Sequence, residues 1–160
     1  GYRTRQILAS LEHAPPEPGP TLVTLTAGGN DLLSAAGSRR FPDPWLDGFI
    51  ADYDELLVAI KAKYPVLTLL AGNIYDPTDG TGVVQSGHDQ WARLFAFLHT
   101  LNTRIFERLE LAGAVPVDIH SAFFGKANDE KHPWVFYNIE PTKLGSSEIR
   151  RLFWQASGLG

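Results

Sequence analysis

The sequence predicts a three-layer α/β/α sandwich with a parallel sheet, and two observations lead to this fold class. Short apolar runs rich in β-branched residues recur along the chain, and amphipathic helical patterns lie between them. Nearly continuous apolar runs of this length are typical of parallel strands that are covered on both faces. Parallel strands joined through helices need right-handed crossovers, so the alternation predicts helices on both sides of one sheet.

Each expected element has its own local signal. The strands are short apolar runs followed by turn-forming residues, and the helices show apolar residues spaced by three and four positions. Asp43 and Pro44 supply a cap and an early proline for the second helix. In chain order, the expected elements are a helix from about Thr4 to Leu11, a strand at Thr21–Ala27, a helix with its apolar face from Trp45 to Ile60, a strand at Val66–Ala71, a helix with its apolar face from Trp91 to Leu109, a strand at Ala114–Asp118, and a helix from about Thr142 to Ala156.

The predicted sheet is thin for a sandwich. Three strands are fewer than the about four to six that sheets usually contain. We therefore expect a single, N-terminally incomplete domain over residues 1–160, with its first strand upstream of Gly1. A homo-oligomer is the alternative way of completing the sheet.

Composition excludes several classes of function. The net charge is −4, and the basic residues form no run longer than two, which argues against a nucleic-acid partner. No apolar stretch approaches the about 20 residues of a membrane-spanning helix. The chain contains no cysteine, so thiolate metal sites and cysteine nucleophiles are excluded, while localisation stays open. The histidines lack ligand spacing, and we predict neither a metal nor a cofactor.

The strongest local signal is Gly28-Gly29-Asn30-Asp31, directly after the first predicted strand. Glycines at the carboxyl end of a strand permit positive φ and close backbone approach, and open α/β sheets place their sites at this end. An asparagine amide there can donate a hydrogen bond to a developing oxyanion. The alternative is that Asn30 and Asp31 only cap the next segment.

This motif resembles the third conserved block of the SGNH (GDSL-type) hydrolases. The resemblance implies the flavodoxin-like SGNH fold and a serine esterase or lipase-like enzyme without a cofactor, acting on a small-molecule ester such as a short-chain acyl ester or an acetylated sugar. It implies that Asn30 holds the oxyanion. Gly1-Tyr-Arg-Thr resembles the second block, in which the glycine N–H completes the oxyanion hole. The first block, with its nucleophilic serine, has no match, and we expect it upstream of Gly1.

The family's histidine block has two imperfect counterparts. Asp129-Glu-Lys-His132-Pro133 matches the letters and predicts His132 as the base, oriented by Asp129. Glu140-Pro-Thr-Lys-Leu-Gly145 matches the frame that leads into the last helix, with Glu140 in place of histidine and Tyr137 in place of aspartate. Glu140 is therefore a possible substitute for the base.

Other residues are weaker candidates. Asp76 follows the second strand and Trp134 lies beside His132, so both are expected to shape the cleft. Trp45, Trp91 and Trp154 fall on helical stripes and are interpreted as core residues. The absent serine and Glu140 also leave room for another function, a catalytically inactive scaffold that serves as a binding or interaction module.

Overall fold

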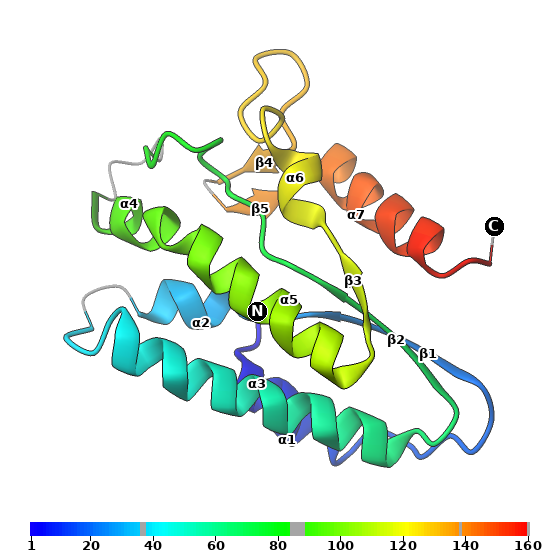
Figure 1. Cartoon of the computed structure of the whole chain (residues 1–160). Helices are drawn as coiled ribbons and strands as arrows, with labels where there is room; N and C mark the ends of the chain where they lie inside the picture. The colour runs from blue at the N-terminus through cyan, green and yellow to red at the C-terminus, as the bar shows by residue number, and fades with distance from the viewer. Residues whose placement is uncertain (36–37, 84–88, 138, 160) are drawn as a thin grey trace.

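The computed structural model describes residues 1–35, 38–83, 89–137 and 139–159, with the side chains of 89–91 left aside. Its helices and strands follow the predicted alternation, with additional short elements (Figure 1). In chain order they are α1 (Thr4–Leu11), β1 (Thr21–Thr26), α2 (Gly29–Ser34), α3 (Asp43–Lys63), β2 (Leu67–Gly72), α4 (Asp89–Ala96), α5 (Leu98–Ala112), β3 (Val115–Val117), α6 (Ile119–Phe123), β4 (Val135–Phe136), β5 (Glu140–Pro141) and α7 (Lys143–Ala156).

The three predicted strands form one parallel sheet in the order β1-β2-β3. Thr21 lies opposite Leu67 and Thr26 opposite Gly72, so β1 and β2 pair along their whole length. The shorter β3 pairs with the second half of β2, from Leu70 to Gly72. The carboxyl ends of all three strands therefore reach the same edge of the sheet, as the sequence predicts.

Helices cover both faces of this sheet, which confirms the three-layer prediction. Leu69 and Ala71 of β2 face the larger core, which is formed with α3 and α5. Leu70, between them, faces the other way and packs with Val117 and with Phe153 of α7 in a second core. Because side chains alternate along a strand, β2 contributes to both layers. Figure 1 shows α3 and α5 on one side of the strands and α7 on the other.

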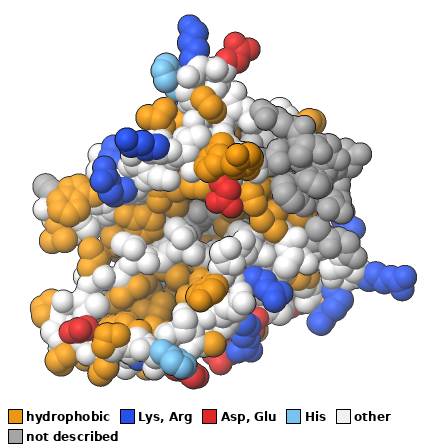
Figure 2. Space-filling view, turned by 180° about the vertical axis from the view of Figure 1, so that it is seen from behind, with side chains coloured by type: hydrophobic (Ala, Val, Ile, Leu, Met, Phe, Trp, Pro, Cys, Tyr) orange, Lys and Arg blue, Asp and Glu red, His pale blue; other side chains and the backbone are white. Residues whose placement is uncertain are grey.

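The second layer is incomplete over β1. Leu22, Thr24 and Thr26, which alternate along this strand, are all exposed, and Leu22 retains 43% of its accessible surface. Within the described residues, no strand pairs with the free edge of β1. Figure 2, the view from behind, shows hydrophobic side chains lying in hollows of the surface. The thin sheet expected from the sequence is thus present, and one of its edge strands is covered on one face only.

Several elements differ from the prediction. The long helix expected through Trp91–Leu109 is two helices, α4 and α5, which are interrupted at Phe97. The helices α2 and α6 and the β4–β5 hairpin are too short to produce a readable period, so the sequence did not predict them.

The tryptophans predicted as core residues have different outcomes. Trp45 is half-buried and stacks on Phe49, with ring centroids 5.6 Å apart. The prediction for Trp154 is wrong: this residue is 57% exposed, because Phe153 beside it takes the inward position. The side chain of Trp91 lies outside the described part of the structure.

No helix among the described residues is both long enough and apolar enough to cross a membrane.

Candidate active site

The turn from β1 into α2 positions the Gly-Gly-Asn-Asp motif. Gly28 adopts φ = 106°, a left-handed conformation that other residues rarely accept. A Cβ at Gly28 would also lie 3.0 Å from the Phe49 ring and 3.1 Å from Ile74. Glycine is therefore required for the chain to turn tightly between α3 and the segment after β2. This turn brings Asn30 to the first turn of α2, at the carboxyl edge of the sheet.

Asn30 lies against the N-terminal segment. Its Nδ2 donates to the backbone oxygen of Tyr2 at 3.2 Å. A Cβ on Gly1 would lie only 2.5 Å from the same Nδ2, so a larger residue there would require the Asn30 side chain to move. The structure thus brings together Asn30 and Gly1, the two residues that the family resemblance assigns to an oxyanion hole. The residue that Asn30 bonds, Tyr2, is 28 positions away in the sequence.

Asp31 fastens the same segment more strongly. Its Oδ2 accepts hydrogen bonds from the Thr4 backbone N–H and the Thr4 hydroxyl, both at 3.0 Å. Thr4 is fully buried and is the first residue of α1, so a carboxylate here satisfies a free helix N–H and interacts favourably with the helix dipole. The expected alternative role of the motif, capping, is therefore real for Asp31, but the helix that it caps is α1 rather than α2.

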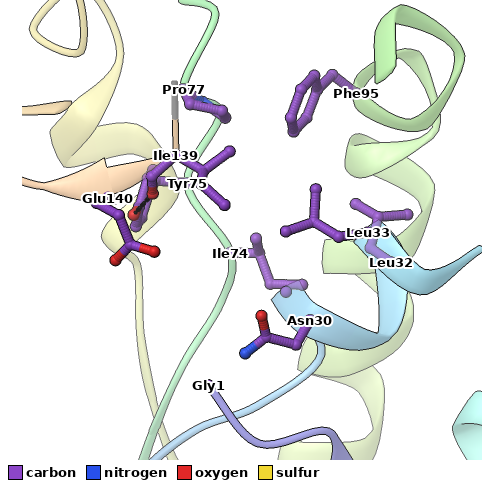
Figure 3. Close-up of a pocket in the computed structure, with 11 residues that line it drawn as sticks. Gly1, Asn30, Leu32, Leu33, Ile74, Tyr75, Pro77, Phe95, Ile139 and Glu140 are labelled. Carbon is purple, nitrogen blue, oxygen red and sulfur yellow. Dashed lines mark hydrogen bonds between the residues drawn. The ribbon is translucent and has the colours of Figure 1, made fainter. Parts of the chain in front are cut away.

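A cavity of about 210 Å³ opens beside Gly1 and Asn30. Figure 3 shows Asn30, Leu32, Leu33 and Phe95 along one wall and Glu140 on the opposite wall, with Ile74 between the walls. The other lining residues are Gly29, Tyr75, Pro77 and Ile139. We call this cavity the main pocket. It combines an amide donor, one carboxylate and mostly apolar walls.

Tyr75 holds the β4–β5 hairpin against the main pocket. Its ring stacks on Phe123 at 4.4 Å, and its hydroxyl donates to the backbone oxygen of Ile139 at 2.5 Å. Burial, together with the negative charge of nearby Glu140, raises the pKa of Tyr75 above its ordinary value. Tyr75 therefore stays a neutral donor at neutral pH, and its bond to Ile139 positions the adjacent Glu140 at the pocket.

His132 and Asp129 lie elsewhere. They belong to the loop between α6 and β4, and neither lines the main pocket. The Asp129 carboxylate accepts the backbone N–H groups of His132 at 2.7 Å and of Lys131 at 3.0 Å, which lowers its pKa. The His132 side chain is exposed. The structure thus brings Asn30, Gly1 and Glu140 around one pocket and does not bring the Asp129–His132 pair there.

Asp76 and Trp134, the predicted cleft residues, are not among those that line the main pocket. Asp76 is buried, and its carboxylate accepts hydrogen bonds from Thr78 and from the backbone N–H of Gly80, which closes the turn after β2. Trp134 is half-buried and packs edge-on against Phe123, with ring centroids 5.2 Å apart. In this arrangement, Asp76 shapes a loop and Trp134 supports the smaller core.

Asn102 is a site-supporting residue that the sequence analysis missed. From α5, its Oδ1 accepts the Ile74 N–H at 2.9 Å and its Nδ2 donates to the Ile74 carbonyl oxygen at 2.7 Å. These two bonds fix the backbone of a residue that lines the main pocket. The sequence did contain a signal, because Asn102 is a polar residue directly beside Leu101 on an otherwise apolar helical stripe. In the structure its side chain is buried, with 6% of its surface exposed.

A second network ties the ends of β2 and β3 together. The Asn73 side chain donates to Asp118 at 2.9 Å and accepts the backbone N–H of His120 at 2.8 Å. Burial alone would raise the pKa of Asp118, but hydrogen bonds from Ser121 and Asn73 outweigh it, so the pKa of Asp118 is lowered. The His120 ring nitrogen Nδ1 lies 3.2 Å from the Ile74 carbonyl oxygen. Because Ile74 lines the main pocket, this network holds the segment after β2 next to the pocket.

A second cavity, of about 320 Å³, adjoins the site at the incomplete layer of the sheet. It shares Gly29, Asn30, Ile74, Tyr75 and Glu140 with the main pocket and extends past the end of β1 to α7. Its other lining residues are Tyr2, Thr26, Ala27, Gly28, Asn73, Ile119, Pro141 and Ile149. We call it the β1-side cavity. In the described part of the chain, no serine lines either cavity, and no three potential metal ligands cluster.

Comparison with known proteins identifies a family to which the sequence is similar. A sequence model of the GDSL-like lipase/acylhydrolase family matches residues 1–147. Among curated proteins, none is significantly similar to the chain in sequence.

Solved structures share the fold. An extracellular lipase from Streptomyces rimosus superposes with a TM-score of 0.74 at 22% identity, over 97% of this chain and 76% of that one. A phospholipase A1 from Streptomyces albidoflavus gives 0.70 at 19% identity, over the same shares of 97% and 76%. An acetylxylan esterase from Geobacillus stearothermophilus gives 0.70 at 15% identity, over 99% of this chain and 69% of that one.

Proposed function

The chain belongs to the GDSL-like lipase/acylhydrolase family, and we propose that it forms the acyl-binding and oxyanion-binding part of a carboxylic ester hydrolase. The observation that carries this proposal is that the Asn30 amide and Gly1 line a mostly apolar pocket that Glu140 also lines. An amide donor beside an apolar cavity suits an ester, whose carbonyl oxygen gains charge as the carbonyl carbon is attacked.

The proposed roles follow the chemistry of acyl transfer. A hydroxyl nucleophile adds to the carbonyl carbon, and its proton passes to a base. Asn30 Nδ2 donates to the resulting oxyanion, and the N–H of Gly1 is its natural second donor. Glu140 is the carboxylate nearest this chemistry, so we assign it the proton-accepting role in preference to His132. The alcohol then leaves with a proton, and water hydrolyses the acyl-enzyme.

The β1-side cavity supports a position for the nucleophile. It lies at the carboxyl end of β1, which is an edge strand, and shares Asn30 and Glu140 with the main pocket. A strand that pairs with this edge, parallel to β1, would end at the cavity. We propose that such a strand carries the nucleophilic serine, from a segment upstream of Gly1 or from a second copy of the chain.

A fluorophosphonate that labels activated serines tests this function. The protein that carries this chain is treated with the reagent, and its intact mass and peptide map are measured alongside hydrolysis of a p-nitrophenyl ester. One stoichiometric adduct together with ester hydrolysis supports the enzyme. Absence of both the adduct and hydrolysis would overturn the proposal in favour of an inactive binding scaffold.

A further inference from the structure

The main pocket combines a few polar groups with an apolar lining. Asn30 and Gly1 supply polar groups on one side, and Glu140 lies on the opposite wall (Figure 3). The remaining side chains are aliphatic or aromatic. They are Leu32, Leu33, Ile74, Tyr75, Pro77, Phe95 and Ile139.

Among the described residues that line the main pocket, the one side-chain hydroxyl already has a hydrogen-bond partner. The Tyr75 hydroxyl donates a hydrogen bond to the Ile139 carbonyl oxygen and stays neutral, since burial and the charge of Glu140 raise its pKa. A hydroxyl-rich group such as a sugar ring would therefore find few partners inside the pocket, and each polar group that it buried unpaired would cost binding. A hydrocarbon chain needs no such partners.

Packing within the protein fixes the apolar wall. Leu32 is 1% exposed and Phe95 is 7% exposed, so the protein itself fixes both side chains. Asn102 holds the backbone of Ile74 with two hydrogen bonds. A preformed pocket rewards a ligand that fills it, because little ordering is required on binding.

On the premise of the ester hydrolase function, we propose that the main pocket binds the acyl group of the substrate and selects a straight chain of about four to eight carbons over acetyl. The cavity measures about 210 Å³. At about 30 Å³ for each water-sized group, and with a methylene group close to that size, it has room for roughly seven such groups. An acetyl group would leave most of the apolar surface uncovered.

A chain-length series tests this selection. The protein that carries this chain is assayed with p-nitrophenyl esters from acetate to dodecanoate. We expect kcat/KM to rise about fourfold for each added methylene group, the factor that corresponds to ~0.8 kcal/mol per buried methylene, and to level off near octanoate. A maximum at acetate, or no dependence on length, would overturn the inference even if hydrolysis is fast.

Substitutions at Leu33, a half-buried pocket residue, change the size of the pocket in both directions. Leu33→Phe should move the preferred length to shorter chains, and Leu33→Ala to longer ones. Leu111→Ala, at a side chain that is 73% exposed on α5, is the matched control and should leave the profile unchanged. If the Phe variant does not fold, the Ala variant and the series on the unaltered protein still decide the outcome.

Direct binding separates this inference from the function on which it rests. Acetamide, butanamide, hexanamide and octanamide are neutral acyl probes that Glu140 does not repel, and saturation-transfer NMR reports their contact with the protein. A hexanamide signal that exceeds the acetamide signal and changes with Leu33 supports the acyl pocket, even in a protein that shows no hydrolysis. Equal and weak signals from all four amides would overturn the inference.

Discussion

Asn30 connects the sequence motif to the site through a contact that involves two distant parts of the chain. Its amide reaches the N-terminal segment, while Asp31 beside it fastens Thr4. One dipeptide therefore both presents a donor and fixes Gly1 next to that donor. A purely structural role for Asn30 and a catalytic one make different predictions, because the hydrogen bond to Tyr2 is a single, exposed one.

Asn30→Ala should lower kcat by about 10²–10³, the loss that follows removal of one oxyanion donor, with the melting temperature little changed. Thr103→Ala, on α5, is the matched control, since its hydroxyl also donates one exposed hydrogen bond to a backbone oxygen, that of His99, at 3.0 Å. Each substitution removes one net hydrogen bond, worth ~1 kcal/mol of stability. Steady-state kinetics and thermal melts of both variants make the comparison. Equal activity in the two would assign Asn30 to structure alone.

Glu140 and His132 are rival bases, and two substitutions distinguish them. Glu140→Gln keeps the shape and removes the proton acceptor, so kcat should fall by roughly 10²–10⁴. His132→Ala, in the exposed loop away from the main pocket, should change kcat less than about twofold under the same reasoning. Rates measured on folded variants decide the assignment. The reverse pattern would restore the Asp129–His132 pair that the sequence favours.

At this scale, the sequence predicted that Asn30 and Gly1 lie at one site, and the structure brings them together, whereas the Asp129–His132 pair that it favoured as the base lies elsewhere. The difference has a physical reason. Asn30 follows a strand through two glycines, so its place at the sheet edge depends on local geometry alone. His132 matches the spacing of the family's histidine block, but the Asp129 carboxylate accepts its backbone N–H and closes a local turn. Glu140 lies at the main pocket in a hairpin that Tyr75 bonds from another part of the chain, and such a contact leaves no local pattern.

Among the elements, the α7 helix depends on a close backbone approach. A Cβ on Gly145 would lie 2.3 Å from the Trp134 carbonyl oxygen. Gly145→Ala should therefore destabilise the protein by about 1–3 kcal/mol, the usual cost of overpacking. Gly48→Ala, in α3, is the control and should stabilise by ~0.5–1 kcal/mol, because no atom lies within 4 Å of the position that its new methyl group would take. Denaturant unfolding of both variants measures the two changes in the free energy of unfolding. A lower free energy for Gly48→Ala, or an unchanged one for Gly145→Ala, would contradict the prediction.

The start of α6 gives a pH-dependent prediction. Hydrogen bonds from Ser121 and Asn73 outweigh burial and hold the pKa of Asp118 below its ordinary value. A lowered pKa in the folded state means that the carboxylate stabilises the fold above about pH 4, and that this contribution is lost as the pH falls through the folded pKa.

Asp118→Asn should therefore melt at a lower temperature than the parent near pH 6, and the two melting temperatures should converge toward pH 2. Melts across this range check the convergence. A gap that stays constant with pH would show that the charge of Asp118 contributes nothing to stability.

Helix and strand positions were predictable where the pattern is long. The first helix and the last helix agree with the sequence within a residue or so, and the three strands within one residue at each end. The break at Phe97 was not predictable, since apolar spacing continues through it. The α2 and α6 helices contain six and five residues, less than two turns, so periodicity cannot reveal them.

For the molecule as a whole, the alternation of elements sufficed to predict the layers, and the count of strands sufficed to predict a thin sheet. The sequence could not show which edge is free. That information depends on strand order, which follows from how α3 and α5 pack across the sheet rather than from any single segment. The structure assigns the free edge to β1, and the β1-side cavity lies at its carboxyl end.

An exposed strand edge with an apolar residue invites pairing with another chain. We therefore expect the isolated 160-residue chain to self-associate, with an apparent mass that rises with concentration in light scattering coupled to size-exclusion chromatography. Leu22→Lys adds a charge to the exposed face of β1 and should shift the chain toward monomer, because charges on an edge strand oppose pairing. Val58→Lys, on an exposed position of α3, adds the same charge away from the edge and should leave association unchanged. A concentration-independent monomer, with or without these substitutions, would mean that the β1 edge is stable unpaired, and the strand that we propose for the nucleophile would lose its structural basis.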